Sequence, residues 1–241
     1  MNVQSILNRL QAGERTRIVA FGSSNTERRI HELHWFDWLD LGIRQTYGRV
    51  HHSVNAGLGG DTARGLLQRF DQDVALYQPH VVFVTIGGND ANPQSGIDEA
   101  EYRDNLLELV RRIRALGATA VRQTYHSADI ERTEPGHGDA FLRFMDIVRA
   151  IAAQTGANLV DHHRRWEPLR IWRVDEYRKL MIDPLHVNPM GNMLIGLDLL
   201  RAFHARLDDT QQHHCAERLR YQQMLDSLAS KTSPDPGTAQ P

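Results

Sequence analysis

Short polar segments of the sequence carry side chains that could together cleave an ester. Ser24 lies in the turn Gly-Ser-Ser-Asn-Thr, and His186 follows Asp183 by three residues. A serine hydroxyl is a weak nucleophile until a base accepts its proton, and histidine titrates near neutral pH. A carboxylate three residues earlier, in a tight turn, could accept the other imidazole N–H and fix the tautomer. These residue types therefore favour nucleophilic acyl transfer.

Two further segments offer hydrogen-bond donors for the oxyanion that such a reaction forms. Gly60, in Gly-Leu-Gly-Gly-Asp-Thr, offers a backbone N–H that no side chain obstructs, and Asn89, in Gly-Gly-Asn-Asp, offers an amide. Ser24 adds its own N–H at a predicted helix start, where such groups lack helical partners. Taken singly, each residue has a structural explanation: Ser24 as a helix N-cap, Gly60 as a turn glycine and Asn89 as a turn cap. The catalytic interpretation depends on their convergence.

The expected elements would bring these segments together. Short β-branched runs predict five strands at residues 17–21, 50–55, 81–86, 118–125 and 158–161. Helices are expected over about 27–47, 62–70, 99–116, 139–154 and 188–207, with an irregular region before the last one. Such alternation predicts an α/β fold with a five-stranded parallel sheet and helices on both faces. Ligands bind beyond the carboxyl ends of such strands, where the serine, glycine and asparagine turns all lie.

With these segments in this order, the chain resembles the SGNH (GDSL-type) hydrolase family. Its blocks are a serine turn after the first strand, a glycine turn after the second, G-x-N-D after the third and D-x-x-H before the last helix, and all occur over about residues 17–205. The resemblance implies a flavodoxin-like three-layer α/β/α sandwich and ester hydrolysis. It also implies a triad of Ser24, Asp183 and His186, with oxyanion donors Ser24, Gly60 and Asn89. One departure concerns Ser23, which stands where the family usually has aspartate and is also the neighbouring candidate nucleophile.

Length and composition are those of an ordinary globular protein. The chain has 241 residues, 41% hydrophobic and 24% charged, with a formal net charge of −2. This balance argues against binding dominated by nucleic-acid phosphates. No apolar run approaches the ~18–20 residues of a membrane span, and we recognise no secretory signal, so a cytoplasmic location is expected. One cysteine, Cys215, allows no intramolecular disulfide, and the scattered histidines lack metal-ligand spacing, so neither metal nor cofactor is expected.

The domain organisation follows from the same patterns. Residues 1–207 should form the hydrolase domain, 208–229 an appended helix and 230–241 a disordered polar tail. The stretch 164–179 interleaves basic and aromatic side chains and leads directly to Asp183. It could form one wall of the substrate site, with aromatic side chains that stack on a sugar: Trp166, Trp172 and Tyr177. The structural alternative for this stretch is a solvated, salt-bridged loop over the sheet.

The favoured function is a serine esterase that removes short acyl groups, such as acetyl, from a carbohydrate or small alcohol through an acyl-enzyme. A lipid acyl hydrolase or a thioesterase of the same family is the alternative within that chemistry, and acyl transfer to another alcohol stays open. An alternative of a different class is a non-catalytic flavodoxin-like protein, whose serine turn would hold a flavin or another phosphate. That alternative leaves Asn89 and the Asp183–His186 pair unexplained. The oligomeric state stays open.

Overall fold

The computed structural model describes residues 3–207 and 215–231 of the chain. Its centre is one sheet of five parallel strands in the order β2-β1-β3-β4-β5. The strands are β1 (Thr16–Gly22), β2 (His51–Gly57), β3 (Val81–Thr85), β4 (Thr119–Gln123) and β5 (Asn158–Val160). The predicted α/β fold with a five-stranded parallel sheet is therefore confirmed. The expected disordered tail lies, from residue 232 onward, outside the described residues.

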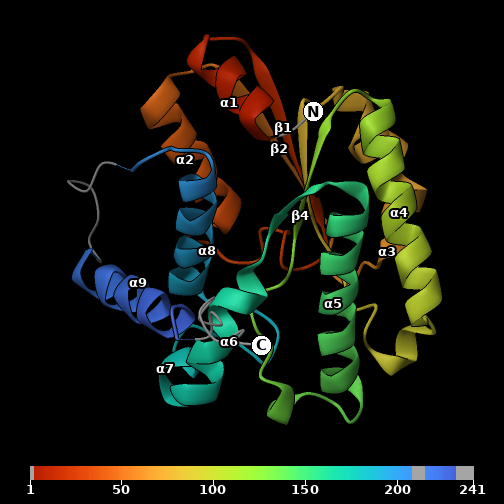
Figure 1. Cartoon of the computed structure of the whole chain (residues 1–241), viewed down its shortest axis with the longest axis vertical. Coiled ribbons are helices and arrows are strands. Elements are labelled where there is room, and N and C mark those ends of the chain that lie inside the picture. Colours follow the sequence, from red (N-terminus) through yellow and green to blue (C-terminus); the bar gives the residue numbers. More distant parts are fainter. Residues whose placement is uncertain (1–2, 208–214, 232–241) are drawn as a thin grey trace, which may run out of the picture.

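Helices cover both faces of the sheet (Figure 1). One face packs on α1 (Val3–Gln11), α2 (Trp35–Tyr47) and α8 (Pro189–Ala202), and the other on α3 (Ala63–Asp73), α4 (Glu99–Ala115) and α5 (His137–Thr155). Successive strand residues point to opposite faces, so Ile18 and Ala20 of β1 join one core, while Val19 and Phe21 join the other. Burial on both faces explains why the central strands β1 and β3 contain continuous apolar runs, Ile18–Phe21 and Val81–Val84.

Three helical regions differ from the sequence expectation. Residues 27–34, expected to be helical, form an irregular loop, and α2 begins only at Trp35. The cause is a capping box: the His34 side chain accepts from the Phe36 N–H, and the Asp37 carboxylate accepts from the His34 N–H. The segment expected to be irregular holds α6 (His162–Trp172) and α7 (Val174–Arg178), and α1 was not expected. Short 3₁₀ turns occupy Ala75–Tyr77, Pro93–Ser95 and Ile130–Arg132.

The C-terminal helix α9 (Cys215–Ala229) is part of the same packed body. Its Tyr221 and Leu225 side chains are each 1% exposed and belong to the core that α6 and α8 share. Arg165 of α6 lies 2.6 Å from the Asp226 carboxylate of α9 and 2.9 Å from that of Asp198 in α8. The segment expected as an appendage thus contributes to the core at one edge of the fold. Among the described helices, none is both long and apolar enough to cross a membrane.

Candidate active site

Ser24, His186 and Asp183 form a continuous hydrogen-bonded chain. Ser24 Oγ lies 2.8 Å from His186 Nε2, and His186 Nδ1 lies 2.7 and 2.8 Å from the two Asp183 carboxylate oxygens. Partial burial opposes ionisation of Asp183, but the Leu185 N–H and the His186 side chain outweigh it and hold the pKa of Asp183 below its usual value. An ionised carboxylate accepts the Nδ1 proton, which leaves Nε2 free to accept the proton of Ser24.

The turn that carries His186 is closed at both ends. The Ile182 N–H donates to His186 O at 2.8 Å, and an antiparallel bridge joins Met181 to Val187. Asn188 then starts α8, where its side chain accepts from the Gly191 N–H at 3.0 Å. Its predicted place as N-cap, with proline at the first helical position, agrees with the structure. This closure fixes the imidazole relative to the sheet.

The nucleophile turn is joined directly to the histidine turn. The Thr26 and Glu27 N–H groups donate to Ser23 O, which curls the chain immediately after β1 and presents Ser24. The Asn25 amide donates to Leu185 O at 3.0 Å, one residue before His186. Two turns that are 160 residues apart in the sequence are thereby held in register.

Ser23, which replaces the family's usual aspartate, is a buried structural residue. Its side chain is completely buried, and its Oγ lies 2.8 Å from the Tyr125 hydroxyl, just beyond β4. Burial raises the pKa of Tyr125 to about 12, so the phenol keeps its proton at neutral pH. Ser23 therefore supports the nucleophile turn from below and has no access to a substrate.

Two of the expected oxyanion donors, Gly60 and Asn89, lie on turns that hydrogen bonds connect to the end of β1 and to each other. Gly60 is exposed with φ of +79°, a conformation that favours glycine, although a Cβ at this position would meet no other atom within 4 Å. Leu58 N–H donates to Gly22 O, so the glycine turn lies against the end of β1. Over residues 3–207 and 215–231, neither the Ser24 nor the Gly60 N–H donates to a protein acceptor. The Asn89 amide donates to Asp61 O at 2.8 Å, which uses one of its two protons.

Arg69 of α3 ties the strand ends beneath these turns. Its guanidinium donates to Gly22 O and Ala56 O, both at 2.9 Å, and lies 2.6 Å from the Asp61 carboxylate. It also lies over the Phe21 ring, 4.5 Å from the centroid. One side chain therefore links the ends of β1 and β2 to the turn that holds Gly60.

A cavity of about 190 Å³ opens beside Ser24 and His186. Its apolar lining includes Ile30 and Ile182, and its charged lining includes Glu27 and Arg29. This wall was not expected from the sequence, because residues 27–34 have a helical pattern but form an irregular loop. The adjacent charges Glu-Arg-Arg directly after the nucleophile turn were the available signal.

The aromatic residues expected to line the substrate site lie elsewhere. Trp166 and Tyr177 are completely buried, and the Tyr177 hydroxyl donates to Ser127 O at 2.8 Å. The expectation that they stack on a sugar is therefore wrong, because α6 and α7 turn these rings into the core. Trp172 is 47% exposed but lines a separate groove of about 430 Å³ that shares no residue with the cavity lined by Ser24 and His186.

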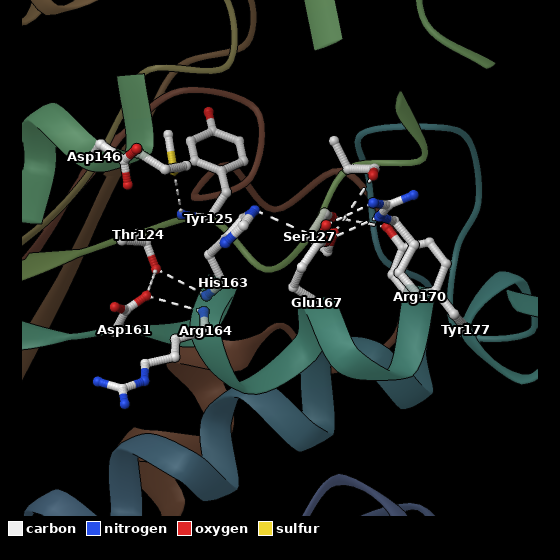
Figure 2. A network of polar contacts seen from close by, with 12 residues as sticks. Thr124, Tyr125, Ser127, Asp146, Asp161, His163, Arg164, Glu167, Arg170 and Tyr177 are labelled. Atoms are coloured by element: carbon white, nitrogen blue, oxygen red, sulfur yellow. Dashed lines mark hydrogen bonds and ion pairs between the residues drawn. The ribbon is translucent and has the colours of Figure 1, made fainter. Parts of the chain in front are cut away.

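Polar side chains around that groove pair mainly with one another (Figure 2). Glu167 holds Arg170 by two hydrogen bonds and also accepts from Ser127. Arg149 joins the Asp161 carboxylate to Nδ1 of His163. The salt bridges of the expected solvated loop are present, but a helix carries them and the paired Glu167 and Arg170 side chains are largely buried.

The sequence is similar to a known family and to two curated proteins. Residues 20–194 match the model of the GDSL-like lipase/acylhydrolase family. Esterase TesA of Pseudomonas aeruginosa is 30% identical over 114 residues, which are 47% of this chain and 53% of that protein. An uncharacterized lipoprotein of Bacillus subtilis, YqeF, is 27% identical over 115 residues, which are 44% of this chain and 47% of that protein. The chain thus spans about half the length of these curated relatives.

Solved structures share the fold at low sequence identity. The acetyl xylan esterase AlAXEase superposes with a TM-score of 0.68 at 19% identity, over 77% of this chain and 98% of that one. The acetylxylan esterase Axe2 of Geobacillus stearothermophilus gives a TM-score of 0.68 at 21% identity, over 80% of this chain and 96% of that one. At these identities the likeness shows the fold alone, whereas the family model covers most of the chain. The chain belongs to the GDSL-like lipase/acylhydrolase family.

Proposed function

We propose that the protein is a serine esterase that removes short acyl groups, acetyl foremost, from an alcohol. The observation that carries this proposal is the hydrogen-bonded chain from Ser24 Oγ through the His186 imidazole to the Asp183 carboxylate. Family membership and the likeness to acetylxylan esterases support the same chemistry. Acetyl groups on a carbohydrate are the substrate that we favour.

The reaction follows from the donors and acceptors at the site. Ser24 Oγ attacks the acyl carbon while Nε2 of His186 takes its proton, and Asp183 stabilises the imidazolium. The Ser24 N–H, the Gly60 N–H and the free proton of the Asn89 amide stabilise the oxyanion. The carbon–oxygen bond to the alcohol then breaks, and Nε2 returns the proton to the departing oxygen. Water clears the acyl-enzyme by the same route.

The cavity favours small substrates over long acyl chains. At about 190 Å³ it holds an acetyl group with part of an alcohol, and charged Glu27 and Arg29 stand among its walls. A lipid acyl hydrolase would need a longer apolar channel beside Ser24. The phosphate-binding alternative finds less support, since the Ser24 hydroxyl is already paired with His186.

The test compares Ser24→Ala with Ser23→Ala in the hydrolysis of p-nitrophenyl acetate. Ser24→Ala should lose about 10⁴-fold or more in kcat and all labelling by a fluorophosphonate, because the Ser24 hydroxyl, unlike that of Ser23, contacts His186. Ser23→Ala should keep the label, since its hydroxyl is buried against Tyr125. Full activity in Ser24→Ala would refute the proposal. Across acetyl, butyryl and longer acyl esters, each added methylene should then change the activation free energy for kcat/KM by ~1–3 kcal/mol.

A further inference from the structure

Two hydrogen-bond donors meet at one nitrogen of the proposed base. Arg29 Nη1 lies 2.8 Å from His186 Nε2, the same atom that lies 2.8 Å from Ser24 Oγ. A guanidinium only donates, and the neutral imidazole offers one lone pair at this position. Asp183 already binds the Nδ1 proton, so both donors compete for that lone pair. This arrangement is that of the site before substrate binds. It changes once the Ser24 proton moves to His186 Nε2.

During the reaction, the leaving alcohol oxygen must take the position beside His186 Nε2 that Arg29 holds in the free site. After Ser24 gives up its proton, Nε2 carries an N–H and can no longer accept from Arg29. The departing alcohol oxygen must approach Nε2 within about 3 Å to receive that proton. An oxygen between the imidazolium and the guanidinium accepts from both and separates two like charges. Arg29 thus stands beside the one atom on which negative charge develops as the ester bond breaks.

We infer that Arg29 is a catalytic residue that donates a second hydrogen bond to the leaving alcohol oxygen. The inference rests on the proposed esterase function and assigns that oxygen to the cavity wall formed by Glu27, Arg29 and Ile30. In this step the acyl carbon–oxygen bond breaks, and the bonding electron pair leaves with the alcohol oxygen. His186 Nε2 gives that oxygen its proton, while Arg29 stabilises the charge and keeps its own protons. Charge-assisted donors of this kind are the stronger ones.

The surroundings of Arg29 suit this exchange of partners. Its side chain is 46% exposed, and its other ionic neighbour in the described chain is the Glu27 carboxylate, at 3.9 Å. Residues 27–34 are irregular, so no helical backbone restrains the side chain. Ile30 and Ile182 line the same cavity and lower its polarity, which strengthens a charge interaction there. Arg29 can therefore move from nitrogen to oxygen within one cavity.

The experiment measures how Arg29→Gln changes the dependence of kcat/KM on the leaving group. p-Nitrophenolate departs as a stable anion, whereas the alkoxide of ethyl acetate needs a proton and charge stabilisation. Both substrates pass through the same acetyl-enzyme, so kcat/KM reports acylation. The ratio of kcat/KM for p-nitrophenyl acetate to that for ethyl acetate should rise about tenfold or more in Arg29→Gln. Arg29→Lys should restore part of the difference because it keeps the charge.

Arg28→Gln is the matched control, since it removes the same charge one residue earlier. The Arg28 side chain pairs with Asp37 and does not line the cavity. The ratio of kcat/KM for the two esters in Arg28→Gln should therefore equal that of the wild type. Equal losses on both esters in Arg29→Gln would overturn the inference. Equal gains in kcat/KM on both esters would also overturn it, because they would show that Arg29 inhibits the reaction by occupying His186 Nε2. Neither equal losses nor equal gains in Arg29→Gln would contradict the esterase proposal, which fails only if Ser24→Ala stays active.

Discussion

Asn89 combines a structural contact with a proposed catalytic one. Its amide is anchored to Asp61 O at 2.8 Å, so the second amide proton has a fixed direction. Asn89→Ala should lower kcat for p-nitrophenyl acetate by about 10²–10³-fold with little change in KM, because the oxyanion forms only after attack. Asn92→Ala, whose side chain caps the following 3₁₀ turn, is the control and should keep its kcat. An unchanged kcat in Asn89→Ala would remove this amide from the oxyanion site.

Ser23 shows how a departure from the family pattern can be accommodated. Support for the nucleophile turn comes here from a neutral hydroxyl pair, Ser23 with Tyr125, in place of a carboxylate. Because neither partner is ionised at neutral pH, no charge is buried beneath Ser24 by this pair. The support still connects the turn after β1 to the segment after β4.

At the scale of elements, Arg69 holds the glycine turn against the ends of two strands of the sheet. Its guanidinium bonds the ends of β1 and β2 and the Asp61 carboxylate, with 15% of the side chain exposed. Arg69→Met should lower the free energy of unfolding by about 2–4 kcal/mol, because Asp61 loses its partner. It should also lower kcat of the folded enzyme, since Gly60 loses its support. Urea unfolding and kinetics on the same sample measure both effects.

Arg112→Met provides the comparison for Arg69. Arg112 likewise lies over an aromatic ring, that of Phe70, and bonds a carboxylate and a carbonyl, but it joins α4 to α3 away from the catalytic turns. This variant should lose stability and keep the kcat of the wild type. If Arg69→Met also kept its kcat, the link between the strand ends and the oxyanion donors would be wrong.

The strands and the chemistry at their ends were predictable, whereas the walls of the site were not. β3 is apolar on both faces, and the turns that carry Ser24, Gly60 and Asn89 each follow a strand, so local sequence indicates both. The loop of residues 27–34 depends on His34 and Asp37 forming a cap, which helical periodicity does not reveal. The sequence of α6 does not indicate a helix, because it contains Pro168 and many basic residues. The segments that α6 packs against, α9 and the segment after β4, are remote in sequence. Such tertiary pairings decide which aromatic side chains remain exposed.

Across the whole molecule, burial has left several titratable side chains in unfavourable surroundings for charge. Burial lowers the pKa of His34 and His162 to about 4 and that of His126 to about 3. Burial also raises the pKa of Asp90 and Asp198 to about 6. The two groups of residues act in opposite directions on acid stability. As the pH falls from 6.5 to 4.5, three histidines gain protons in the unfolded chain, while two acids gain them in the folded one.

These five groups alone make the unfolded chain bind about one more proton than the folded protein over this range, so through them lower pH favours unfolding. At about 1.4 kcal/mol per pH unit for each net proton, the free energy of unfolding should fall on the order of 3 kcal/mol between pH 6.5 and 4.5. Urea unfolding at half-unit steps measures this slope. His162→Gln should reduce it by about one proton, since Gln stays neutral in both states, whereas His52→Gln, at an exposed site, should leave it unchanged. A slope that His162→Gln does not alter would show that burial does not exclude the proton from this imidazole.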